Sequence, residues 1–113
     1  MGLSGPAKRL TVVVGEQDWL GHHSLAGEIV RRAHAAGLAG VTVSRGIEGY
    51  GRSQHVHTTR ILSLSDDLPI TIVVVDRPEA VEAFAAEVLS VVEGGLVTIE
   101  DVEVLRGPDS SGG

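Results

Sequence analysis

The sequence predicts a single α+β domain with the element order strand, helix, strand, strand, helix, strand. Four runs of β-branched residues are bounded by glycine, proline or acidic residues, at positions 10–14, 41–49, 69–75 and 96–104. Apolar residues recur at helical spacing after Ser24 and again after Asp76. This order is that of a ferredoxin-like βαββαβ sandwich, an antiparallel four-stranded sheet with two helices on one face.

In the first half of the chain, residues 10–14 stop at Gly15, which is typical of a buried strand, and a polar loop follows. Ser24 is a good N-cap for the first helix, and Gly37 stands where a left-handed residue ends a helix. Residues 41–49 predict the second strand.

The third strand is predicted to begin near Arg60 and to resume over residues 69–75. It would form a hairpin with the second strand, with a long tip between them. The last strand is predicted within residues 96–104.

The second helix has a clear start signal. We expect Asp76 to be its N-cap, with Pro78 in the first turn and Glu79 completing an acidic capping box. Gly94 and Gly95 are expected to end it.

Residues 8–106 are predicted to form the one domain, and the tail 107–113 has nothing to bury and is predicted to be disordered. Residues 70–75 are rich in Val and Ile on both faces of their strand. We therefore expect the sheet face without helices to be buried against other copies of the chain, in a homo-oligomer.

Composition argues against several classes of partner. The 113-residue chain has a formal net charge of −6, which disfavours general binding to nucleic acid or anionic lipid. It has no cysteine, so disulfides and thiolate metal sites cannot form. No apolar run approaches the roughly 20 residues that span a bilayer, and the N-terminus lacks the pattern of a signal peptide. We expect a cytoplasmic protein without direct membrane insertion.

The segment 40–52 is the most informative part of the sequence, because a β-branched strand runs into alternating glycines and then a cation. The amides of Gly49, Tyr50, Gly51 and Arg52 could line a concave anion site that the Arg52 guanidinium completes. A glycine-kinked strand leading into a loop is the structural alternative, and composition alone favours that alternative.

No nucleophile, base and orienting group can be assembled from the sequence, so we do not expect an enzyme. Asp66 and Asp67 are adjacent and precede a proline, which indicates turn residues and not an acid–base pair.

Two histidines, His55 and His57, would face the same side of an extended strand and are the candidate metal ligands. No third or fourth ligand follows at a recognisable spacing, so a chance pairing is favoured over a metal site.

Three motifs carry a family resemblance: Arg45-Gly-Ile-Glu-Gly-Tyr-Gly51, Arg60-Ile-Leu-Ser-Leu-Ser-Asp-Asp-Leu-Pro69 and Glu93-Gly-Gly-Leu-Val-Thr-Ile-Glu-Asp101. Through them the chain resembles an uncharacterised bacterial family of PII-like proteins within the PII/CutA superfamily. The resemblance implies a homotrimer, ligand clefts between subunits, and a flexible loop after the second strand that signals to a partner. It also implies a membrane transporter of the fluoride-exporter type as the expected partner.

The resemblance further implies a site for an adenine nucleotide, with no required cofactor. The residues that match the nucleotide-binding segments of PII proteins are Gly49, Tyr50, Gly51, Arg52, Gln54, Pro69, Ile70, Gly94 and Gly95.

The chain departs from the PII pattern in the turn before the last strand, because residues 93–101 contain no lysine and three acids. A triphosphate would need Arg45, Arg60, Arg106 or a divalent cation to compensate for these acids. A CutA-like structural or divalent-metal-binding trimer, which needs no nucleotide, is the alternative.

Overall fold

The computed structural model describes residues 2–47 and 67–108. Its helices and strands are β1 (Gly5–Gly15), β2 (Trp19–Leu20), β3 (His23–Ser24), α1 (Leu25–Ala35), β4 (Val41–Arg45), β5 (Pro69–Asp76), α2 (Pro78–Leu89) and β6 (Leu96–Val104).

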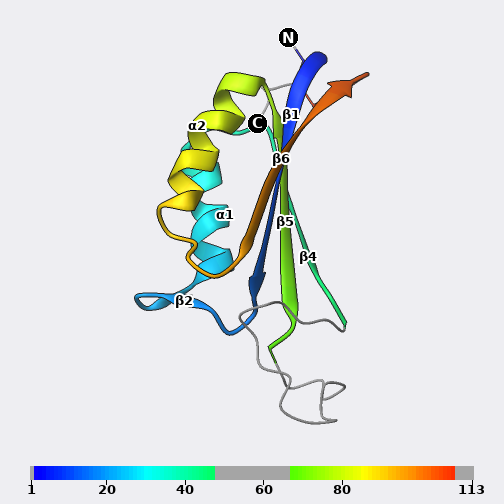
Figure 1. Ribbon diagram of the computed structural model, residues 1–113. Coiled ribbons are helices and arrows are strands. Elements are labelled where there is room, and N and C mark those ends of the chain that lie inside the picture. Colours follow the sequence, from blue (N-terminus) through cyan, green and yellow to red (C-terminus); the bar gives the residue numbers. More distant parts are fainter. Residues whose placement is uncertain (1, 48–66, 109–113) are drawn as a thin grey trace.

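Four strands form an antiparallel sheet in the order β4-β5-β1-β6, and both helices lie on one of its faces (Figure 1). The predicted ferredoxin-like fold is therefore confirmed. The short strands β2 and β3 pair with each other in the connection that the sequence predicts as a polar loop.

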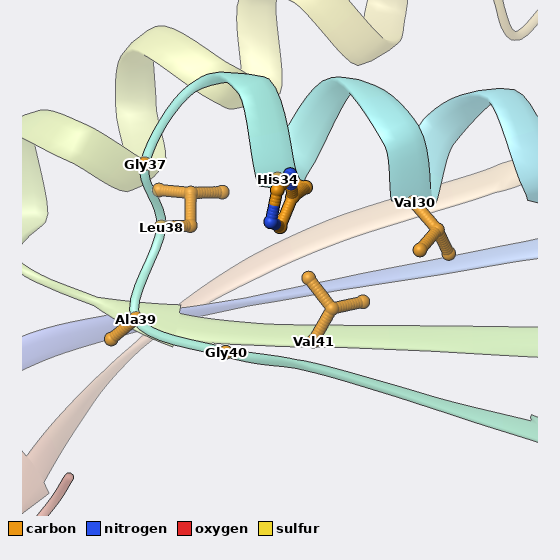
Figure 2. Close-up of a pocket in the computed structure, with 7 residues that line it drawn as sticks. All are labelled: Val30, His34, Gly37, Leu38, Ala39, Gly40 and Val41. Atoms are coloured by element: carbon orange, nitrogen blue, oxygen red, sulfur yellow. The ribbon is translucent and has the colours of Figure 1, made fainter. Parts of the chain in front are cut away.

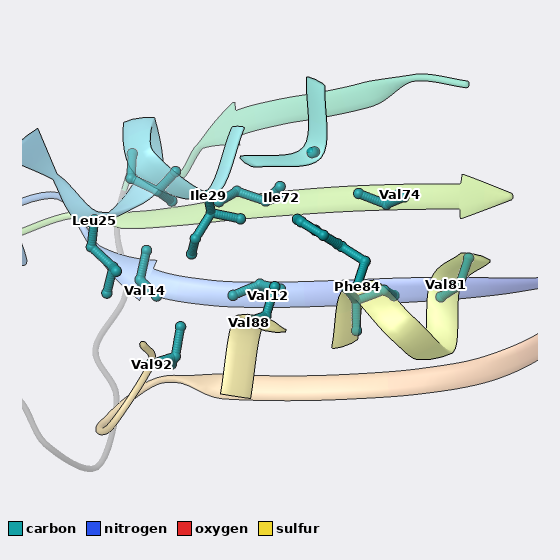
Figure 3. Close-up of a cluster of buried hydrophobic side chains, with 13 residues drawn as sticks. Val12, Val14, Leu25, Ile29, Ile72, Val74, Val81, Phe84, Val88 and Val92 are labelled. Atoms are coloured by element: carbon teal, nitrogen blue, oxygen red, sulfur yellow. The ribbon is translucent and has the colours of Figure 1, made fainter. Parts of the chain in front are cut away.

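The core lies between the sheet and the helices (Figure 3). Every second residue of the two central strands faces the helices, because side chains alternate along a strand. The buried core residues are Leu10, Val12, Val14, Leu25, Ile29, Ala33, Ile70, Ile72, Val74, Val81, Phe84, Val88 and Val92.

The other face of the sheet carries no helix among the described residues (Figure 1). It presents Thr11, Val13 and Val73 from the central strands, which are only partly buried, and Leu96, whose exposed fraction is 58%. An apolar sheet face of this kind fits the expectation of a homo-oligomer.

Both predicted ends of α1 are confirmed. The Ser24 hydroxyl accepts a hydrogen bond from the Gly27 N–H (3.1 Å). Gly37 has φ of 76°, and the N–H groups of Gly37 and Leu38 donate to the carbonyls of His34 and Ala33 (3.0 and 3.2 Å). These are the two bonds of a Schellman motif, which satisfies the last carbonyls of a helix.

The predicted ends of α2 are both wrong: its N-cap is not Asp76, and the helix ends at Leu89, before Gly94 and Gly95. Asp76 is the last residue of β5, and the N-cap is Arg77, which makes no side-chain capping bond. The buried Asp76 carboxylate instead accepts hydrogen bonds from the N–H groups of Ala39 (2.8 Å) and Arg77 (2.7 Å). The acid thus fastens the loop after α1 to the end of β5, while Pro78 occupies the first turn as predicted.

The second strand is shorter than predicted, since β4 ends at Arg45 and not near Gly49. Gly46 still donates its N–H to the Pro69 carbonyl (2.7 Å), but Pro69 has no N–H to return. Within the described residues, the hydrogen bonding between β4 and β5 ends at this point. The predicted start of the third strand near Arg60 lies outside the described residues.

Residues outside the predicted domain 8–106 contact each other at the two ends of the described chain. Leu3 is buried, its N–H donates to the Pro108 carbonyl (3.1 Å), and its carbonyl accepts from the Gly107 N–H (2.9 Å). The first two residues of the predicted tail are thus tied to the N-terminal segment. Residues 109–113 lie outside the described part of the chain.

Candidate functional site

The predicted site residues that the structure describes gather at one end of the sheet, the lower end in Figure 1. Arg45 ends β4 and lies opposite Ile70 of β5, and Pro69 begins β5 opposite Gly15. Gly94 and Gly95 lead into β6, whose first residue pairs with β1 at Val13. We call this region the sheet end; it combines the end of β1, the end of β4, the start of β5 and the turn before β6.

Arg45 is held at the sheet end by Glu16. The Arg45 Nε lies 2.8 Å from Glu16 Oε2, and Nη2 donates to Oε1 at 3.2 Å. The Arg45 side chain is 56% exposed, so this ion pair is worth only about 0.2–1 kcal/mol in water. Glu16 was not among the predicted site residues, because only the strand register brings it beside Arg45.

Pro69 and Ile70 have different surroundings. Pro69 is partly buried, and a Cβ added at Gly46 would lie 2.7 Å from its Cγ, so β4 and β5 approach closely there. Ile70 is 8% exposed and belongs to the core cluster. Contact of either residue with a nucleotide base stays a prediction.

Gly95 packs against β1. A Cβ at this position would stand 2.6 Å from the Val13 carbonyl oxygen and 3.0 Å from the Cγ1 atoms of Val14 and Val92. A glycine is therefore required here by packing alone, whatever else it contacts.

Two further carboxylates lie at the sheet end, and sequence reasoning did not select them for it. Asp18 Oδ2 accepts from the Gly15 N–H (2.9 Å), and Asp67 Oδ1 accepts from the Gln17 N–H (2.7 Å). A Cβ at Gly15 would stand 2.7 Å from Asp67 Oδ1, so this glycine lets the acid approach. The Asp67 bond joins residues 50 positions apart and links the segment before β5 to the loop after β1.

The charge of the described sheet end is negative, because Glu16, Asp18 and Asp67 outnumber Arg45. The described sheet end could bind the neutral part of a ligand. Its carboxylates would repel phosphate oxygens unless further cations were present. No group of three or more His, Asp or Glu residues arranged to hold a metal ion occurs among the described residues.

Several predicted residues lie outside the described ranges. They are the nucleotide candidates Gly49, Tyr50, Gly51, Arg52, Gln54 and Arg60 and the metal candidates His55 and His57. Their roles stay predictions.

A separate pocket of about 440 Å³ lies between the end of α1 and the start of β4. Figure 2 shows Val30 and His34 pointing from α1 towards Val41 of β4. The loop from Gly37 to Gly40 forms the rest of the wall, and the bond from Ala39 to Asp76 fixes that loop. Arg45 is at the opposite end of β4, so this pocket is distinct from the sheet end.

The helix layer contains one buried acid, Glu28, which is 5% exposed. Hydrogen bonds from Arg31, and then from Arg32, lower the pKa of this carboxyl to about 2. Arg32 Nη1 also lies 3.4 Å from Glu87 of α2. This network ties the two helices together and does not reach the sheet end.

The family of the chain follows from its sequence. Residues 7–104 match the family DUF190, described as Uncharacterized ACR, COG1993. The chain belongs to this family. Two UPF0166 proteins of Aquifex aeolicus (strain VF5) are similar to it: each aligns over 77 residues, or 68% of this chain, with identities of 35% and 30% over 72% and 80% of the relatives. The predicted membership of an uncharacterised PII-like family is confirmed.

Solved structures share the fold. A protein of Thermus thermophilus described as a PII-like signaling protein has a TM-score of 0.62 at 16% identity, covering 89% of this chain and 91% of its own. CPII of Thiomonas intermedia K12, in a structure bound to ADP and bicarbonate, has a TM-score of 0.57 at 24% identity, covering 89% and 90%. At these identities the similarity establishes the fold.

None of the helices in the described part of the chain is long and apolar enough to cross a membrane.

Proposed function

We propose that this chain is a PII-like regulatory protein that binds an adenine nucleotide at the sheet end, in clefts between the copies of a cytoplasmic homotrimer. The observation that supports it most is the meeting of Arg45, Pro69 and Gly95 at one end of the sheet, although they come from separate parts of the sequence. Binding clefts are commonly built in this way, from loops at one edge of a sheet.

The choice of ligand rests on fold and charge together. CPII, which shares the fold, has been solved bound to ADP with bicarbonate and bound to ADP and AMP with acetate. The acids at the sheet end disfavour a ligand with many phosphates, so ADP and AMP are the first ligands to test. Arg52 and Arg60, or a divalent cation, would supply the positive charge that the phosphates need.

The regulatory part of the proposal concerns the segment after β4, which contains Arg52. Ligand contacts through this segment would create or hide a surface for a partner, an equilibrium between two states that the ligand biases. A membrane transporter is the partner that the family resemblance suggests.

Calorimetric titration of the native protein with ADP and AMP, with and without Mg²⁺, tests the site. The variants are Arg52→Ala and Arg45→Ala, and the matched control is Arg31→Ala, which removes another exposed arginine from an ion pair. Loss of a hydrogen bond to a charged group costs roughly 1.5–3 kcal/mol, so each site variant should bind at least tenfold more weakly while the control is unchanged.

Equal affinity in all three variants would contradict the site. If the protein bound no nucleotide but bound a transition metal stoichiometrically, the CutA-like alternative would replace the proposal.

A further inference from the structure

Among the described residues, Trp19 is the one Phe, Tyr or Trp side chain that lies on the surface. Phe84 is in the core and 2% exposed, whereas Trp19 is 63% exposed. An indole in contact with water can bind in two ways, because its flat face stacks on other rings and its Nε1–H donates a hydrogen bond. The position of Trp19 decides which ligand such a ring can meet.

The hairpin of β2 and β3 carries Trp19 at the same end of the molecule as the sheet end (Figure 1). The preceding residue, Asp18, forms a turn with Gly15 at the end of β1. Its N–H donates to the Gly15 carbonyl (3.1 Å), and its Oδ2 accepts from the Gly15 N–H (2.9 Å). Glu16, which pairs with Arg45, precedes Trp19 by three residues, so the Cα atoms of Glu16 and Trp19 are at most about 11 Å apart. Trp19 therefore borders the sheet end on the side of β1.

The hairpin fixes the indole before any ligand binds. Trp19 pairs with Ser24, the N-cap of α1, and the Asp18 carbonyl accepts from the Leu25 N–H (2.8 Å). Leu20 packs against the core, and successive side chains of a strand point to opposite sides, so Trp19 points away from the core. A ring on a backbone held in this way loses little conformational freedom on binding.

We propose that the adenine base of the bound nucleotide stacks on Trp19, with the phosphates on the side of Arg45. The inference rests on the proposed nucleotide binding and names the residue that recognises the base.

The charges near Trp19 favour a base over a phosphate. Glu16 and Asp18 are its nearest acids in the chain, and their carboxylates repel phosphate oxygens. Carboxylates accept hydrogen bonds, and the amino group of adenine donates them, so a neutral base suits the same surroundings. Stacking of a base on an aromatic ring needs no charge on either partner.

A second copy of the chain is the other occupant that an exposed tryptophan would suit. The two are separable by experiment, because only the contact with a nucleotide depends on added ligand.

Fluorescence of the native protein tests the stacking directly, because Trp19 is the single tryptophan of the chain. With excitation at a wavelength that adenine does not absorb, AMP should quench the emission and make the indole less accessible to acrylamide. Ribose 5-phosphate, which carries a phosphate and no base, should change neither quantity. If AMP occupies its site by calorimetry and both quantities stay constant, the stacking is refuted.

Substitutions measure what the ring contributes. Trp19→Ala should bind AMP about 5- to 150-fold more weakly, which is the loss expected for one stack between a base and an aromatic side chain. Trp19→Phe keeps a ring and should recover most of the affinity, whereas Trp19→Leu keeps only apolar area and should not.

Leu105→Ala is the matched control. Leu105 is 89% exposed and follows β6 at the opposite end of the sheet, so its loss should leave the AMP affinity unchanged. Circular dichroism confirms that each variant is folded, and the exposure of Trp19 means that the fold does not depend on its ring.

The outcomes separate this inference from the proposed function. If the native protein and Trp19→Ala bind AMP and ADP equally well, only the stacking is refuted. If the native protein binds neither nucleotide, the stacking and the proposed ligand are refuted together. A lower mass of Trp19→Ala by light scattering, without nucleotide, would assign the ring to a contact between copies and overturn the stacking.

Discussion

Replacing Gly95 by alanine should destabilise the protein, because the added methyl group has no room. It would stand 2.6 Å from the Val13 carbonyl oxygen, and this oxygen belongs to the central strand β1, which is paired on both sides. A backbone atom cannot rotate away as a side chain can. Overpacking of this kind costs about 1–3 kcal/mol, or roughly 4–8 °C in Tm for each kcal/mol in a domain of this size.

Gly40→Ala is the matched control, since nothing lies within 4 Å of its Cβ position and its φ is not left-handed. It should raise the free energy of unfolding by about 0.4–1 kcal/mol, because alanine restricts the unfolded chain. Urea denaturation at fixed protein concentration measures both variants. If Gly95→Ala were as stable as Gly40→Ala, the close packing of the turn against β1 would be refuted.

Three further perturbations follow from single contacts. Asp76→Ala leaves the N–H groups of Ala39 and Arg77 without their acceptor and should cost about 1–3 kcal/mol in urea denaturation; an unchanged midpoint would contradict this. The lowered pKa of Glu28, about 2 against an ordinary 4.5, means that its ion pairs stabilise the fold above pH 4.5 and lose this effect as the pH falls towards 2. The Tm of Glu28→Gln should therefore fall less steeply between pH 4.5 and pH 2 than the Tm of the native protein. Equal slopes of Tm against pH in the two proteins would exclude the effect. Gly37→Ala forces a side chain into a φ of 76° and should lower stability by about 1–2 kcal/mol, which calorimetry can measure against Gly40→Ala.

The fold was predictable because its signals are local. Ser24 and Gly37 mark the ends of α1 through bonds within four residues, and those bonds are present. Asp76 misled the prediction because its carboxylate accepts from Ala39, 37 positions away, and from Arg77, and it is not the N-cap of α2. A capping pattern describes only neighbours, so it cannot reveal an acid that links two distant elements.

The candidate site was predictable only in outline. The resemblance selected Pro69 and Gly95, the acidic turn before the last strand led to Arg45, and the strand register brings the three to one end. Glu16 pairs with Arg45 across 29 positions, so no spacing rule in the sequence could have indicated it. Gly95 is needed for packing against β1. The sequence alone cannot distinguish such a glycine from one that lets a ligand approach the backbone.

The ion pair between Arg45 and Glu16 limits how strongly the sheet end can bind a phosphate. Its guanidinium already donates to Glu16, so a phosphate must either displace that carboxylate or add a negative charge beside it. Both routes become more costly with each phosphate, and Asp18 and Asp67 add to the cost. If a divalent cation is bound to the phosphates, the nearby carboxylates attract that cation and favour binding of the ligand. The ratio of ADP to AMP affinity, with and without Mg²⁺, therefore reports whether the acids of the sheet end repel the phosphates or help to hold their metal ion.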